Sequence, residues 1–275
     1  MKNIAIWMVL YMNDQCLREY YLSRKHYQRI IEYFNLPIKI YGILYGTDKE
    51  PTWSDGILYL PLNGRTMEDA DSKTFIKYAD FLKAETAVNA DYHVRLTPST
   101  YVNLPRINSI IQNGDFSNTV LCGEMQRSTV DGLQHLYPRG NFVMYSEQHR
   151  KEMKEILEKT PLQVVAREGC GSNDDHLLGT LLFKYLRLKY KSLGLHSTTD
   201  KTDRLTPDNI DNAYCIVYKD YFNADQGYAL FFLQWLIDYF EGKYSIKHTV
   251  TDRTFNGNWS LTNDTLKYWL SKIGL

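Results

Sequence analysis

Two adjacent carboxylates, Asp174 and Asp175, are the side chains of this sequence best suited to acid–base chemistry. They begin an apolar stretch with helical spacing, 174–189, and Asn173 before them is a candidate N-cap. A carboxylate beside an attacking hydroxyl can take its proton. Two acids in the first turn of a helix can also simply interact favourably with the helix dipole. We favour the first interpretation and keep the second as the alternative.

Strands and helices alternate over the first half of the chain. The apolar run 3–10 is typical of a central strand, 14–34 has apolar residues at helical spacing, and a second strand at 38–45 follows Pro37. Further strands are predicted at 55–60, 93–96, 119–122 and 142–145, and further helices at 71–88, 104–112, 147–159, 226–240 and 262–273. This order predicts an α/β fold with a mostly parallel central sheet flanked by helices.

A polar, turn-rich stretch at 197–211 marks a boundary. We therefore expect one domain over 1–200 and a helical C-terminal extension over 201–275 that packs on the core. Within the extension, 228–240 is apolar nearly all round, which indicates burial. There are two alternatives. This segment could make peripheral contact with a membrane surface, or Trp235, Tyr239 and Trp259 could form a wall on which a sugar stacks.

The sequence lacks the common phosphate-binding and nucleophile motifs. No GxGxxG follows the first predicted strand, and neither GxxxxGK[ST] nor GxSxG occurs. In an open parallel sheet, ligands bind at the carboxyl ends of the strands, so the chemistry is expected in the loops that follow them. A nucleotide-type sheet without either phosphate loop favours transfer from a sugar nucleotide.

Composition excludes several classes of protein. Lys plus Arg and Asp plus Glu both total 32 in 275 residues, so the formal net charge is zero, which argues against a nucleic-acid partner. The four cysteines, Cys16, Cys122, Cys170 and Cys215, contain no CxxC pair, so we expect free thiols in a reducing compartment. No apolar run approaches the roughly 18 residues of a membrane span, and we expect a cytoplasmic protein.

One segment resembles a known family. Residues 91–103 read DYHVRLTPSTYVN, similar to the strand-plus-loop segment Y-x-x-K-x-D-x-D-x-F-V-N of the β-1,3-glycosyltransferase and Fringe group. Upstream, 55–58 (DGIL) and 71–74 (DSKT) resemble the D-I-L and L-K-T elements of that group. The resemblance implies a GT-A fold, in which a nucleotide-diphospho-sugar binds at the carboxyl ends of the sheet.

Three downstream segments continue the resemblance in the same order. Residues 137–146 (YPRGNFVMYS) are similar to Y-P-x-Y-x-x-G-x-G-Y-V-x-S, with a shorter stretch before the glycine. Residues 172–179 (SNDDHLLG) resemble E-D-V-x-x-G, and 195–197 (LHS) resemble F-H-S. The resemblance thus covers about residues 1–200 and leaves the C-terminal extension without a counterpart.

The departure from the family pattern concerns the metal ion. The Asp-x-Asp loop of the group coordinates a divalent cation across the two donor phosphates, whereas this chain has Thr97, Pro98 and Ser99 there. Hydroxyls are poorer ligands than carboxylates for Mn²⁺ or Mg²⁺, so we predict no metal ligands here and leave the use of a cation open. The charge of the departing diphosphate must still be neutralised. The candidate cations are Arg95, Arg139 and Lys73, with Arg65 and Lys201 in loops.

The resemblance also implies individual roles. It places the general base on the second acid of the pair, Asp175, with Asp174 beside it. The expected donor contacts are Thr97, Ser99, Arg95, Lys73 and His196. The expected acceptor contacts are Gly140, Asn141 and Arg139. The alternatives are a half-exposed strand arginine for Arg95, a structural histidine for His196, and an ordinary tight turn at 140–141.

Together these features predict an inverting glycosyltransferase. It would move a sugar from a nucleoside-diphosphate sugar, a UDP-sugar first among them, to a hydroxyl of an oligosaccharide, glycolipid or glycoprotein in the synthesis of a surface glycan. The alternative, favoured by the lost Asp-x-Asp, is a degenerate transferase that serves as a glycan- or protein-binding module. A nucleotidyltransferase would need acidic metal ligands after a strand, and the sequence offers none.

Overall fold

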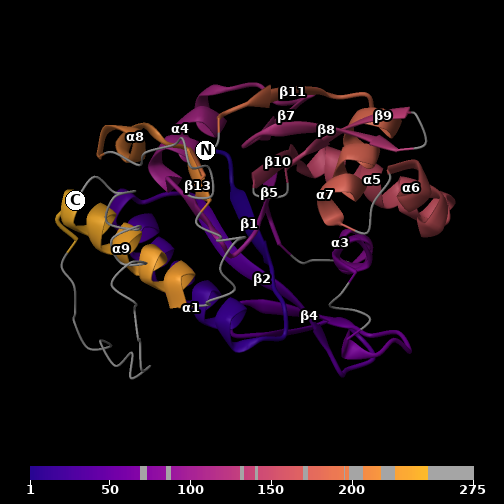
Figure 1. Cartoon of the computed structure of the whole chain (residues 1–275), viewed down its shortest axis with the longest axis horizontal. Helices are drawn as coiled ribbons and strands as arrows, with labels where there is room; N and C mark the ends of the chain where they lie inside the picture. Colours follow the sequence, from indigo (N-terminus) through magenta and orange to yellow (C-terminus); the bar gives the residue numbers. More distant parts are fainter. Residues whose placement is uncertain are drawn as a thin grey trace.

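The computed structural model of the chain describes residues 1–68, 73–84, 88–130, 133–139, 142–169, 173–194, 196–197, 207–217 and 227–246. Within these residues the main sheet has eight strands in the order β11-β7-β10-β5-β1-β2-β4-β3 (Figure 1). The strands are β1 (Ile4–Val9), β2 (Ile38–Gly46), β3 (Thr52–Ser54), β4 (Ile57–Pro61), β5 (Tyr92–Leu96), β7 (Thr119–Cys122), β10 (Phe142–Ser146) and β11 (Lys189–Ser192). The four central strands β5, β1, β2 and β4 are parallel, whereas β10 runs antiparallel to β5 and β7. The predicted α/β fold with a mostly parallel sheet is confirmed.

Helices cover both faces of this sheet (Figure 1). Along β1 the side chains alternate, so that Ile4, Ile6 and Met8 pack toward one helical layer and Ala5, Trp7 and Val9 toward the other. Burial on both faces explains why the strand has a continuous apolar sequence. The first layer contains α1 (Asp14–Phe34), α4 (Leu104–Asn113) and α9 (Gly227–Lys243), and the second contains α3 (Thr74–Lys83), α5 (Glu147–Lys159), α6 (Leu162–Gly169) and α7 (Asp174–Gly179).

Two smaller sheets flank the main one. The strands β12 (His196–Ser197), β13 (Cys215–Val217) and β6 (Thr100–Val102) form a three-stranded sheet, and β8 (Met125–Val130) pairs with β9 (Leu133–Pro138) in a hairpin. The remaining described elements are a π-helix, η1 (Thr180–Tyr185), and a short helix, α8 (Pro207–Asn212).

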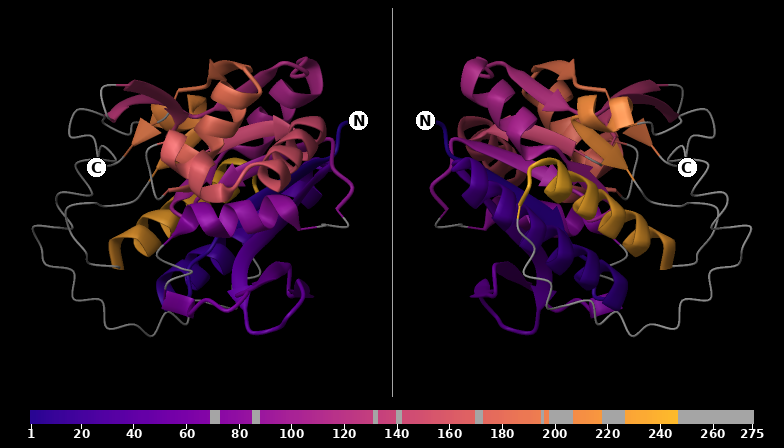
Figure 2. Two further views of the ribbon diagram at one scale, coloured as in Figure 1. Left: turned by 90° about the vertical axis from the view of Figure 1, so that its right-hand side faces the viewer. Right: turned by 90° about the vertical axis from the view of Figure 1, so that its left-hand side faces the viewer.

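Of the residues beyond position 200, the structure describes 207–217 and 227–246, and within them α9 packs on the first layer beside α1 (Figure 2). The His26 imidazole lies between them: its Nδ1 is 2.7 Å from Glu241 Oε1 and its Nε2 is 3.0 Å from the Tyr101 hydroxyl. Arg29 Nε also donates to Glu241 Oε1 at 2.8 Å. None of the described helices is both long enough and apolar enough to cross a membrane.

The structure differs from the sequence prediction in several elements. The single helix predicted at 174–189 is wrong beyond residue 185, because Arg187 has a left-handed φ of 55° and Lys189–Ser192 then pairs with β7 as an edge strand. The short strand β3, the β8–β9 hairpin and α6 were not predicted. The helix predicted at 262–273 and Trp259 lie outside the described residues.

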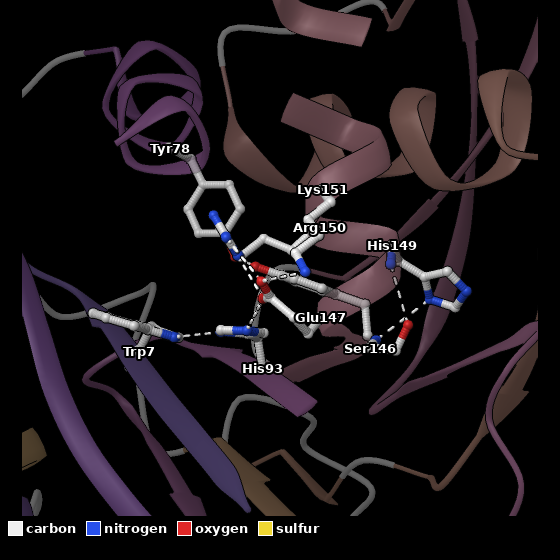
Figure 3. A network of polar contacts seen from close by, with 9 residues as sticks. Trp7, Tyr78, His93, Ser146, Glu147, His149, Arg150 and Lys151 are labelled. Atoms are coloured by element: carbon white, nitrogen blue, oxygen red, sulfur yellow. Dashed lines mark hydrogen bonds and ion pairs between the residues drawn. The ribbon is translucent and has the colours of Figure 1, made fainter. Parts of the chain in front are cut away.

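A buried polar network joins β1, β5 and α5 beneath the second layer (Figure 3). The Trp7 indole donates to His93 Nδ1 at 3.0 Å, and an indole nitrogen is only a donor, so the proton of the imidazole sits on Nε2. His93 Nε2 then donates to Glu147 Oε2 at 2.7 Å, and Arg150 binds both carboxylate oxygens of Glu147. Burial lowers the pKa of His93 more than the Glu147 carboxylate raises it. The network thus fixes β5 through a neutral imidazole.

The first prediction concerns Glu147. Burial alone would raise the pKa of its carboxyl, but the hydrogen bonds from His93 and Arg150 outweigh burial and lower the pKa from 4.5 to about 2. Ionised Glu147 therefore stabilises the fold above pH 4.5, and this contribution is lost as the pH falls from 4.5 toward 2. Because solvent screens this partly exposed carboxylate, we expect Glu147→Gln to lower the free energy of unfolding by about 1–2 kcal/mol at pH 7, and the gap to wild type to shrink below pH 4.5. Urea unfolding at pH 7, 4.5 and 3.5 measures this, with the α5 surface variant Glu158→Gln as control; a gap that stays constant with pH contradicts the account.

Candidate active site

The loop 97–99 lies at the carboxyl end of β5, where the chain turns into β6. Thr100 N donates to Thr97 O at 3.1 Å, and the Thr97 and Thr100 hydroxyls are 2.7 Å apart and share a hydrogen bond. Pro98 is buried, whereas Thr97 and Ser99 are half-buried. The loop is therefore a tight turn at the carboxyl end of the sheet, and it is not fully buried in the core.

Arg95, the penultimate residue of β5, does not face outward as expected: it is only 3% exposed. Its Nε donates to Asp174 Oδ2 at 2.7 Å, and its Nη2 contacts the same oxygen. The third nitrogen, Nη1, is buried without a hydrogen-bond partner among the described residues. Burial alone would lower the pKa of Arg95, but the Asp174 and Asp175 carboxylates outweigh it and keep the guanidinium charged. The result is a buried ion pair between β5 and the first residue of α7.

The same aspartate joins α7 to α3. The backbone N–H of Asp174 donates to Thr74 Oγ1, in the first turn of α3, at 3.2 Å. Lys73, immediately before α3, is exposed. The beginnings of α3 and α7 thus meet beside the end of β5, and the exposed Lys73 directly precedes α3.

Asp175 is half-buried next to this ion pair. Its Oδ1 accepts a hydrogen bond of 2.9 Å from the backbone N–H of His176. Burial raises the pKa of Asp175, the charge of Asp174 raises it further, and the Arg95 guanidinium opposes the rise. A carboxylate with a raised pKa is a stronger base near neutral pH than an ordinary aspartate.

The β8–β9 hairpin packs closely against α7. The Tyr137 and His176 rings meet edge to face with centroids 4.1 Å apart. A Cβ on Gly179 would lie 2.8 Å from the Leu136 carbonyl oxygen and 2.6 Å from Tyr137 Cβ, so only glycine permits this approach. Burial raises the pKa of Tyr137, and the nearby Asp175 charge adds to the rise. The hairpin therefore forms a wall beside Asp175.

Of the predicted acceptor residues, the structure describes only Arg139, which follows the last residue of β9. The Arg139 guanidinium donates from Nη1 to Glu124 at 2.9 Å and is partly exposed. Gly140 and Asn141 lie outside the described residues, as does the loop candidate Lys201.

The backbone of His196 belongs to the small sheet that includes β6, the strand after the 97–99 loop. In β12 it is opposite Ile216 of β13, which is opposite Tyr101 of β6, the strand that follows the 97–99 loop. Its side chain lies outside the described part of the chain.

Lys77 of α3 was missed by the sequence analysis. It is 0% exposed, and its Nζ donates to the Leu10 carbonyl, at the end of β1, at 2.6 Å. One turn further along α3, Asp80 accepts from the Tyr45 hydroxyl at 2.9 Å and pairs with Arg65. The available signal was a lysine four residues before the core residue Phe81 on the apolar face of a predicted helix.

Two further features concern the possible metal ligands and the position of a hollow in the protein. Within the described residues, no three His, Cys, Asp or Glu side chains are grouped so that they could hold a metal ion. A hollow of about 200 Å³ lies at the opposite, amino end of β1 and β2, lined by Asn3, Lys39 and neighbouring residues. It is remote from the end of the sheet that carries the acids.

Comparisons with known proteins place the chain near two solved glycosyltransferase structures. It is similar to a glycosyltransferase involved in the glycosylation of the major capsid of PBCV-1, with 10% identity and a TM-score of 0.44 over 85% of this chain and 99% of that one. It is also similar to the apo-form glycosyltransferase GlyE of Streptococcus pneumoniae TIGR4, with 14% identity and a TM-score of 0.37 over 99% of this chain and 60% of that one. No protein-family model and no curated protein sequence matches it. At these identities and TM-scores neither similarity carries an argument about activity, which has to rest on the residues of the site.

The buried ion pair gives the second prediction. Removing either partner leaves an uncompensated buried charge, so we expect Arg95→Ala and Asp174→Ala each to lower the free energy of unfolding by about 3–5 kcal/mol. The double variant Arg95→Ala/Asp174→Ala should cost less than the sum of the single changes. Urea unfolding checks this, with Arg139→Ala, from the partly exposed pair with Glu124, expected to cost about 1 kcal/mol or less. Fully additive costs, or single costs as small as that of the control, would contradict the pairing.

Proposed function

We propose that the chain is an inverting glycosyltransferase that transfers a sugar from a nucleoside-diphosphate sugar, a UDP-sugar in the first instance, to a carbohydrate hydroxyl. One observation carries the proposal. Asp175, a carboxylate with a raised pKa, is held through its neighbour Asp174 and Arg95 at the end of β5, immediately before the 97–99 loop. In an open α/β sheet this is the end at which a nucleotide ligand binds.

The proposed reaction is a single in-line displacement. The acceptor oxygen forms a bond to the anomeric carbon while the bond from that carbon to the diphosphate oxygen breaks. Asp175 takes the proton of the acceptor hydroxyl, and the nucleoside diphosphate leaves with the bonding electron pair. Asp174 is a positioning residue in this scheme, because its carboxylate is occupied by Arg95.

We propose that this transfer does not depend on a divalent cation. The residues at the Asp-x-Asp position are hydroxyls and a proline, and the nearest acid, Asp174, is already neutralised by Arg95, so the donor set does not suit Mn²⁺ or Mg²⁺. Positive charge would come from Lys73 at the surface and from the buried Lys77. Thr97 and Ser99 would donate hydrogen bonds to the phosphates.

The acceptor would lie on the other side of Asp175, against the wall formed by Tyr137 and His176. Aromatic rings suit the apolar faces of sugars, and their polar atoms suit the hydroxyls. Arg139, close to this wall, remains an acceptor contact in the proposal, as do Gly140 and Asn141.

The third prediction tests the role of Asp175. The purified protein is incubated with UDP-, GDP- and TDP-sugars and mixed saccharide acceptors, with and without EDTA, and released nucleoside diphosphate is measured. We expect release that survives EDTA and falls about 10²–10⁴-fold in Asp175→Asn. Glu158→Gln, an exposed acid of α5, should retain wild-type activity.

The pH profile adds an independent readout. Since the pKa of Asp175 is raised above 3.8, kcat/KM should rise with pH along a limb centred above that value. Activity that is lost in EDTA and restored by Mn²⁺ would contradict the metal-independent scheme. Failure of the wild type to bind any of these nucleotides would instead favour a glycan-binding module.

A further inference from the structure

Lys77 is the most deeply buried cation at the candidate site. A lysine at 0% exposure is unusual, because burying an ammonium group is costly unless the surroundings compensate the charge. Here the Nζ donates to the Leu10 carbonyl at 2.6 Å and lies 5.2 Å from the centroid of the Tyr11 ring and 5.4 Å from that of Tyr45. The compensation therefore comes in part from the carbonyl that ends β1 and from two tyrosine π-faces.

These contacts fix the point at which the chain leaves the sheet. Beyond Leu10, the Tyr11 N–H donates to Cys16 Sγ at 3.2 Å, and the Asn13 side chain caps α1 by accepting from Cys16 N at 2.8 Å. The loop is thus anchored by α1 from one face of the sheet and by Lys77 of α3 from the other. Between these anchors Tyr11 remains 36% exposed.

A second set of contacts extends the Lys77 environment to β2. The Tyr45 hydroxyl donates to Asp80, and Arg65 lies 5.3 Å from the centroid of the Tyr45 ring while also pairing with Asp80. Lys77 therefore shares Tyr45 with this group and joins the carboxyl ends of two adjacent parallel strands, the edge where an open sheet binds nucleotides.

From this geometry we propose that Lys77 is a positioning residue for the nucleotide donor, acting through Tyr11. It holds the end of β1 and the Tyr11 ring in the orientation that receives a nucleoside diphosphate. This inference rests on the proposed function of the site. It assigns Lys77 to donor binding and not to the proton transfer, which Asp175 performs.

The test uses the full-length chain with UDP as the probe, in EDTA, by isothermal titration calorimetry. Lys77→Met keeps the apolar stem and removes the charge and the hydrogen bond to Leu10. We expect it to weaken UDP binding about tenfold or more and to raise the donor KM similarly, with kcat within about threefold of wild type. The matched control Lys83→Met, in the last turn of the same helix, should bind UDP within about twofold of wild type.

Tyr11→Leu gives a second route to the same answer. Because Lys77 acts through Tyr11, this variant should weaken UDP binding by itself, and the double variant should lose less than the product of the two single losses. Folded Lys77→Met that binds UDP like wild type overturns the inference. Should Lys77→Met fail to fold, wild-type affinity in Tyr11→Leu overturns it equally. If the wild type binds neither UDP, GDP nor TDP, the proposed function itself fails.

Discussion

The buried ion pair between Arg95 and Asp174 is the interaction on which the rest of the site depends. It joins the end of a central strand to the first turn of α7, and both side chains are nearly inaccessible to water. In such surroundings an unpaired charge is expensive, so the two elements cannot separate without a large loss of stability. Asp175, the next residue along α7, is thereby held close to Arg95, and its pKa is raised by burial and by the Asp174 charge, against the opposing effect of the Arg95 guanidinium.

Helix α3 makes polar contacts with α7, with the end of β1 and with β2 at this end of the sheet. Thr74 accepts from the Asp174 backbone, Lys77 reaches the end of β1, and Asp80 binds Tyr45 of β2. The apolar side chains of the same helix, such as Phe81 against Trp7, hold it on the sheet. A single amphipathic helix thus combines core packing with the placement of charges, which is why polar residues occur on its buried face.

The fold was largely predictable because buried positions are apolar and recur at the regular spacing of strands and helices. The continuous apolar run of β1 and the helical spacing of α1 gave bounds close to those observed. The error at 174–189 arose because the residues after the π-helix still include the apolar Leu186 and Leu188, and no local sequence signal predicts the left-handed Arg187 between them. Asp174 and Asp175 were selected as adjacent acids at the start of a predicted helix, and their catalytic role stays a prediction. The burial of Arg95 and of Lys77 could not be predicted, since each depends on contacts with residues 79 and 67 positions away.

The most direct test is a crystal structure of the protein soaked with a UDP-sugar. The account predicts the diphosphate beside the 97–99 loop and Lys73, with the anomeric carbon facing Asp175 and the β8–β9 hairpin behind the acceptor space. Nucleotide density in the hollow near Asn3 and Lys39 at the amino end of the sheet, with none at the 97–99 loop, would contradict it.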